Sequence, residues 1–171
     1  MAYDWISHHL YFVDGVRAKI EVVRTDVDNS NRYRKTIINS TIARKPRGIA
    51  VHPVAGSVNF VSTKLSFFAP KLKLFCTISR ITVSRYMFWT DWISGAPGIY
   101  RACLDGSDTK VLFSTPTVEW PNGITVDFIA ERIYWVDAKE DYIASSDFFG
   151  KGFKKVIQRD VSFIVDRFYM C

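Results

Sequence analysis

Three aspartates recur at matching places and are the residues whose type and spacing first suggest chemistry. Asp14, Asp91 and Asp137 each follow two aromatic residues and one intervening residue, in YFVD, FWTD and YWVD. A ring of such acids could serve catalysis or hold a metal ion. Repetition argues against both roles, because catalysis needs unlike groups that converge on one substrate. We therefore expect these aspartates to accept backbone N–H hydrogen bonds at strand ends, as structural residues.

Histidines and cysteines give weaker signals. Histidine titrates in the endosomal pH range, so His8, His9 and His52 could form a pH switch. However, His8 and His9 precede a strand, and His52 takes the place that Asp127 has in a later copy of the repeat. No C-x-x-C pair is present, so neither a zinc site nor a disulfide framework follows from the cysteines, which are Cys76, Cys103 and Cys171.

The aspartates belong to a longer repeated unit. An isoleucine follows each of them and opens a similar run, at Ile20, Ile99 and Ile143. Between the copies stand PRGIAVHP (46–53) and PNGITVDF (121–128). Each unit thus has four short apolar segments, rich in β-branched and aromatic residues and too short for helices. The pattern predicts an all-β fold: part of a β-propeller, with about three blades of four antiparallel strands.

Alternation within a strand predicts which side chains share a sheet face. Phe88 and Thr90 should point one way, and Met87, Trp89 and Asp91 the other. Because stacked blades bury both faces, the aromatic residues are interpreted as packing residues. The residues assigned to this structural motif are Asp14, Phe88, Trp89, Thr90, Asp91, Tyr134, Trp135 and Asp137.

Residues 57–85 have no counterpart in the other copies. This tract contains Lys64, Lys71, Lys73, Arg80 and Arg85 but no acid, and so accounts for most of the net charge of +6. Charge confined to one tract argues against nucleic-acid binding, which needs a basic folded face. The tract could be a basic amphipathic insertion that contacts an anionic membrane or a partner. Alternatively, it is a gene-model error such as a translated intron.

The resulting organisation is a partial propeller over 1–56 and 86–160, a basic insertion over 57–85, and a divergent tail over 161–171. The first ten residues lack the charge and apolar pattern of a signal peptide. The longest stretch without Asp, Glu, Lys or Arg, 48–63, is too short to cross a bilayer. We therefore expect neither a signal peptide nor a membrane span in this chain.

Several residues just outside strand ends are candidates for ligand contact. Trp92, Trp120 and Asn122 lie where propellers expose loops, and aromatic residues at such places often anchor protein ligands. Lys139, with Arg101, could meet acidic groups of a ligand. Asn39 opens Asn-Ser-Thr, an N-glycosylation acceptor pattern. We expect no catalytic residue, no metal and no cofactor.

Together these motifs resemble the YWTD, or class B, repeat of the low-density lipoprotein receptor family. The similarity extends through DWISHHLYFVD, PRGIAVHP, MFWTDW, CLDGSDTKVLF, WPNGITVD and ERIYWVDAKEDYIASSD, and is greatest to the large receptor-related endocytic members. The resemblance implies a six-bladed propeller beside EGF-like modules, on the extracellular side of a single-pass glycoprotein receptor in the cell membrane. Such propellers bind or release protein and lipoprotein ligands during endocytosis and are not enzymes.

The chain departs from the family pattern in ways that leave alternatives open. It is expected to begin at the second strand of a blade, and about three blades of the ring are missing from it. One alternative is a metal-dependent hydrolase of the lactonase type, suggested only by Pro121-Asn122-Gly123. Another is a truncated product without independent activity.

Overall fold

Three sheets, each of four antiparallel strands, make up the part of the chain that the structure describes. The computed structural model describes residues 1–27, 33–53 and 85–158. The first blade contains β1 (Ala2–Asp4), β2 (His9–Asp14), β3 (Lys19–Arg24) and β4 (Arg34–Ile38). The second contains β5 (Pro46–His52), β6 (Tyr86–Asp91), β7 (Gly98–Cys103) and β8 (Lys110–Ser114). The third contains β9 (Pro121–Asp127), β10 (Arg132–Asp137), β11 (Tyr142–Asp147) and β12 (Lys154–Gln158).

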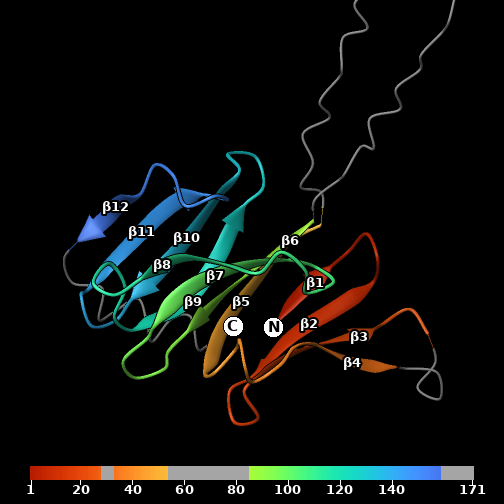
Figure 1. Ribbon diagram of the computed structural model, residues 1–171. Helices are drawn as coiled ribbons and strands as arrows, with labels where there is room; N and C mark the ends of the chain where they lie inside the picture. Colours follow the sequence, from red (N-terminus) through yellow and green to blue (C-terminus); the bar gives the residue numbers. More distant parts are fainter. Residues whose placement is uncertain (28–32, 54–84, 159–171) are drawn as a thin grey trace, which may run out of the picture.

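This arrangement confirms the predicted fold class, a partial YWTD-type propeller built from four-stranded blades. The blades fan out with β1, β5 and β9 towards the middle and β4 and β12 at the outer ends (Figure 1). One expectation was wrong, because the first blade does not begin at its second strand. The short strand β1 pairs with β2, with Ala2 opposite Tyr11 and Asp4 opposite His9. Three residues make this strand too short to recognise from alternation.

The three blades share one register. Asp14, Asp91 and Asp137 end the second strand of each blade and lie opposite the first residue of the third strand. In the second blade His52 pairs with Tyr86, as Asp127 pairs with Arg132 in the third. Apart from Arg85, the basic tract 57–85 lies outside the described residues, as does the tail 161–171.

Each of the two blade–blade junctions contains a hydrophobic core. Trp89 and Met87 are fully buried in the core between the first and second blades, where the Trp89 ring stacks on Tyr100 at 5.1 Å. Phe88 points the other way, into the core between the second and third blades, and contacts Phe148. Neighbouring residues of β6 therefore enter different cores, as the alternation predicts.

A hydroxyl group ties the second blade to the third. Thr90 Oγ1 accepts a hydrogen bond from the Gly48 amide at 2.8 Å and donates one to the carbonyl oxygen of Asn122 at 2.7 Å. Gly48 permits this close approach, because a Cβ atom there would lie 2.5 Å from the same carbonyl oxygen. Strands β5 and β9 are therefore held together at their starts, beside the loops described next.

Across 1–27, 33–53 and 85–158, no helix has the length and apolar content needed to cross a membrane.

Candidate ligand-binding site

Asp91 fixes the loop that leads into the second blade. Its carboxylate is fully buried and accepts hydrogen bonds from the backbone amides of Arg44, at 2.8 Å, and Lys45, at 3.0 Å. Burial raises the pKa of Asp91, and these amide hydrogen bonds oppose that rise. The amide of Trp92 also donates to the Lys45 carbonyl at 3.0 Å. The residue after β6 is thereby placed beside the loop that precedes β5.

Asp137 does the same in the third blade. Its fully buried carboxylate accepts hydrogen bonds from the amides of Glu119, at 2.7 Å, and Trp120, at 3.1 Å. It also accepts one from the amide of Lys139, in the turn that follows β10. Asp14, in contrast, binds only the turn after its own strand, through the amides of Val16 and Arg17. The two buried aspartates thus fix the loops at one end of the fan.

These loops surround a hollow of about 460 Å³, named here the tryptophan hollow. The Trp92 and Trp120 rings lie 5.8 Å apart at an interplanar angle of 59°. Trp120 keeps 47% of its surface exposed although it is a large aromatic residue. The residues that line the hollow are Lys45, Trp92, Ile93, Ser94, Gly95, Pro97, Thr115, Glu119, Trp120 and Lys139.

Positive charge gathers at the tryptophan hollow. The Lys45 ammonium lies 5.1 Å from the Trp92 ring centre, and the Arg47 guanidinium lies 4.4 Å from it. Lys139 pairs with Glu119 at 3.4 Å. Cations over an indole face are attracted by the ring, so they also hold Trp92 in place. Aromatic groups beside cations suit the apolar and acidic side chains of a protein ligand.

The structure brings together three of the four sequence-derived candidates for ligand contact. Trp92, Trp120 and Lys139 all line the tryptophan hollow. Asn122 is not among the lining residues: its carbonyl oxygen takes part in the contact with Thr90. The idea that Arg101 assists Lys139 is wrong, because Arg101 is only 2% exposed and donates to the Phe148 carbonyl and to Asp108.

Two further sequence candidates lie away from the tryptophan hollow. Asn39 is exposed after β4, and its side-chain oxygen accepts a hydrogen bond from the Thr41 amide at 3.1 Å. His52 is only 4% exposed and lies between the rings of Phe128 and Phe148, each 5.1 Å away. Burial lowers the pKa of His52, which favours its neutral form. Glycosylation of Asn39 remains a prediction, and a pH role for His52 remains the less favoured alternative.

Sequence reasoning missed Lys45, Arg47 and Glu119. They stand before the first strand of a blade or at its start, and nothing in the repeat distinguishes them from ordinary loop residues. The sequence feature that could have indicated these loops is the aspartate at the end of the second strand of the same blade, Asp91 or Asp137. Its carboxylate accepts hydrogen bonds from the loop before the first strand. Among the described residues, no group of three or more His, Cys, Asp or Glu side chains is placed to hold a metal ion.

Comparisons with known proteins give one consistent family. Residues 85–128 match the model of the low-density lipoprotein receptor repeat class B. The chain is 32% identical over 139 residues to the vitellogenin receptor Yl of Drosophila melanogaster, which covers 81% of this chain and 5% of that receptor. It is 30% identical over 142 residues to the vitellogenin receptor of Solenopsis invicta, covering 83% of this chain and 6% of that receptor.

One further relative supports the same family, and one solved structure shares the fold. The human low-density lipoprotein receptor-related protein 5-like protein is 29% identical over 143 residues, covering 84% of this chain and 42% of that protein. A chain in the crystal structure of a nidogen/laminin complex superposes with a TM-score of 0.67 at 22% identity. That match covers 93% of this chain and 47% of the other, and it shows the fold alone. Of the two vitellogenin receptors, in contrast, the chain spans only 5% and 6% of the length.

Proposed function

Because the chain carries a low-density lipoprotein receptor class B repeat within three propeller blades, we propose that it is a non-enzymatic ligand-binding module of a receptor-like protein. The relatives named above as receptors support this reading. A protein ligand would bind at the tryptophan hollow, and EGF-like modules and further blades would flank the described part. The module would act on the extracellular side of the cell membrane, in receptor-mediated endocytosis.

The observation that carries this proposal is the gathering of Trp92, Trp120 and Lys139 around one hollow. A loop aromatic that only packs would be covered by its own fold, but Trp120 keeps 47% of its surface exposed. Both tryptophans are nonetheless held firmly, since the loops on either side are bound to the buried carboxylates of Asp91 and Asp137. Preorganised aromatic groups of this kind supply much of the affinity at protein interfaces.

Vitellogenin is the ligand to test first, because two relatives are named as its receptors. We expect the full chain to bind immobilised vitellogenin saturably in biolayer interferometry. Replacing both Trp92 and Trp120 with Ala should weaken binding at least about tenfold, since truncation of aromatic anchors typically costs 2 kcal/mol or more. Labelled vitellogenin should also enter cells that display the chain on their surface.

Trp5→Ala is the matched control, because Trp5 has a similar exposed fraction, 47%, but lies in the turn between β1 and β2. Its binding curve should match that of the unmodified chain. Lack of saturable binding would exclude vitellogenin as the ligand. Equal affinity of the double variant would show that the ligand binds elsewhere on the molecule.

A further inference from the structure

The two blade–blade junctions can be compared position by position at the end of the fan opposite the tryptophan hollow. In the second junction, aromatic rings fill this end. Phe148 lies 5.1 Å from Phe88, and Phe149 lies 6.2 Å from Tyr86. The Arg101 guanidinium lies over two of these rings, 4.6 Å from the centre of Tyr86 and 4.8 Å from that of Phe149. Side chains of the described residues therefore occupy this end of the second junction.

The first junction has smaller residues at four of the five equivalent positions. The strand registers define the equivalence, and both turns after the third strand contain a glycine with positive φ, 89° at Gly106 and 80° at Gly150. The replacements are His9 for Tyr86, Val22 for Arg101, Leu104 for Phe148 and Asp105 for Phe149, while Tyr11 corresponds to Phe88. Two phenyl rings are therefore absent from the first junction.

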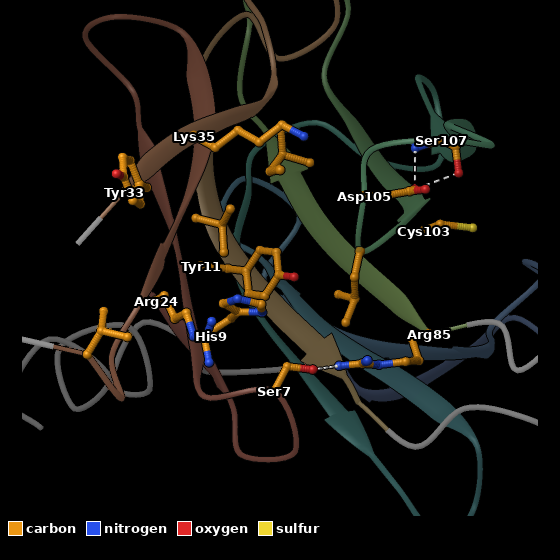
Figure 2. Close-up of a pocket in the computed structure, with 14 residues that line it drawn as sticks. Ser7, His9, Tyr11, Arg24, Tyr33, Lys35, Arg85, Cys103, Asp105 and Ser107 are labelled. Carbon is orange, nitrogen blue, oxygen red and sulfur yellow. Dashed lines mark hydrogen bonds between the residues drawn. The ribbon is translucent and has the colours of Figure 1, made fainter. Parts of the chain in front are cut away.

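An open hollow of about 840 Å³, named here the junction hollow, lies where those rings would be (Figure 2). Its apolar surface comes from Tyr11, Val22, Ile37 and Leu104, which all belong to or pack on the core between the first two blades. Figure 2 shows Tyr11 in the middle of the hollow, with Asp105 and Ser107 across from it. An occupant would therefore extend an existing hydrophobic core.

The rim of the junction hollow offers hydrogen bonds but little net charge. Arg24 is paired with Asp26, and Arg85 with Asp4. Hydrogen bonds from Ser107 and the nearby Lys35 cation lower the pKa of Asp105, so that carboxylate is ionised at neutral pH. Such a rim suits the backbone of a peptide better than a strongly charged ligand.

We propose that the junction hollow is a second binding site, which accepts two adjacent aromatic side chains from a protein partner. The second junction is the template for this occupant, since Phe148 and Phe149 fill the same space there. The site is separate from the tryptophan hollow: Arg85, before the start of β6, lines one, and Trp92, after its end, lines the other. It therefore goes beyond the ligand site proposed above.

The test uses two labelled peptides and the full chain. Ser-Ser-Asp-Phe-Phe-Gly-Lys copies residues 145–151, and the matched control peptide has Leu-Asp in place of Phe-Phe, as in the first junction. We expect saturable binding of the Phe-Phe peptide in fluorescence anisotropy. The control should bind at least about tenfold more weakly, because it lacks both phenyl rings, of which Phe148 is buried in the template junction. Equal binding of both peptides, or none at millimolar concentration, would overturn the proposal.

A variant chain locates the site. Replacing Leu104 with Phe and Asp105 with Phe fills the hollow with residues that the equivalent turn of the third blade already contains. This variant should keep the circular dichroism spectrum and lose Phe-Phe peptide binding at least tenfold, whereas Trp120→Ala should leave it unchanged. Unaltered binding to the filled variant would refute the assignment. If sodium oleate binds in a filling-sensitive way and the peptide does not, the hollow is a lipid site and the protein partner is wrong.

Discussion

The conserved position of the aspartate within the repeat does not give it the same structural role in every blade. Asp91 is fully buried and joins a strand end to the loop that enters its blade, whereas Asp14 only closes the turn after its own strand. We expect Asp91→Asn to lower the free energy of unfolding by about 1–3 kcal/mol, because one of the two loop amides loses its acceptor on the buried side chain. Urea denaturation measures this change.

Asp14→Asn is the matched control, since it makes the same chemical change in an exposed turn. Its effect should be much smaller than that of Asp91→Asn. Equal losses in the two variants would mean that burial and the contact with the entering loop do not distinguish these aspartates.

Glu21 gives a pH-dependent prediction. Hydrogen bonds from Arg34 and Lys19 lower the pKa of this nearly buried carboxyl to about 2. A carboxyl whose folded pKa is below its unfolded pKa stabilises the fold above the unfolded value, and this stabilisation is lost as pH falls towards the folded value. Glu21→Gln should therefore melt below the unmodified chain at pH 7, and the gap should shrink between pH 4.5 and pH 2. A gap that is constant with pH would contradict the prediction.

At the scale of the elements, the approach of β5 to β9 depends on one glycine. A Cβ atom at Gly48 would lie 2.5 Å from the Asn122 carbonyl oxygen, but at Gly123 it would meet nothing within 4 Å. Both residues follow Pro-x in equivalent first strands. We expect Gly48→Ala to lower the free energy of unfolding by roughly 1–3 kcal/mol through steric strain, and Gly123→Ala to leave it nearly unchanged. The melting temperatures of the two variants test this prediction. If both variants melt at a similar temperature, β5 and β9 can move apart to admit the methyl group, and the close approach at Gly48 does not limit stability.

The strands could be predicted from sequence better than the spaces between them. Asp91 and Asp137 could be expected at strand ends, and Phe88 and Trp89 on opposite faces, because alternation and repetition are properties of the chain itself. Strand β1 was missed because three residues are too few to show alternation. Arg101 was placed wrongly because its burial depends on a neighbouring blade. The junction hollow was also missed, although comparing Leu104-Asp105 with Phe148-Phe149 copy by copy would have indicated it. The ligand-contact roles of Trp92 and Trp120 remain predictions.

At the scale of the described blades together, the two faces of the second blade contribute to two different hydrophobic cores. Phe88 belongs to one core and Trp89 to the other, and both side chains are fully buried. We expect the described blades to unfold as one cooperative unit, because neither core survives without the sheet between them. Trp89→Ala should lower the free energy of unfolding by about 3–5 kcal/mol in a single transition.

Urea titrations followed by far-UV circular dichroism and by tryptophan fluorescence test this cooperativity. The two curves should coincide for the unmodified chain and for the variant. Trp5→Ala, at an exposed position, should cost roughly 1 kcal/mol or less. Separate midpoints for the two signals would show that blades unfold independently.

From the long connection between β5 and β6, we expect this hairpin to form late in folding. Strands β5 and β6 are hydrogen-bonded neighbours although residues 53–85 lie between them in the chain. In the other blades the corresponding connections are much shorter, residues 5–8 between β1 and β2 and residues 128–131 between β9 and β10. Each doubling of loop length adds about 0.6 kcal/mol to the entropic cost of closing the loop. The connection between β5 and β6 is roughly three doublings longer than that between β9 and β10, so this hairpin should form more slowly. In pulsed hydrogen exchange, β9 and β10 should gain protection before β5, and the reverse order would contradict this. The blade that both cores depend on would then be the last to be completed, and both cores would form together at that final step.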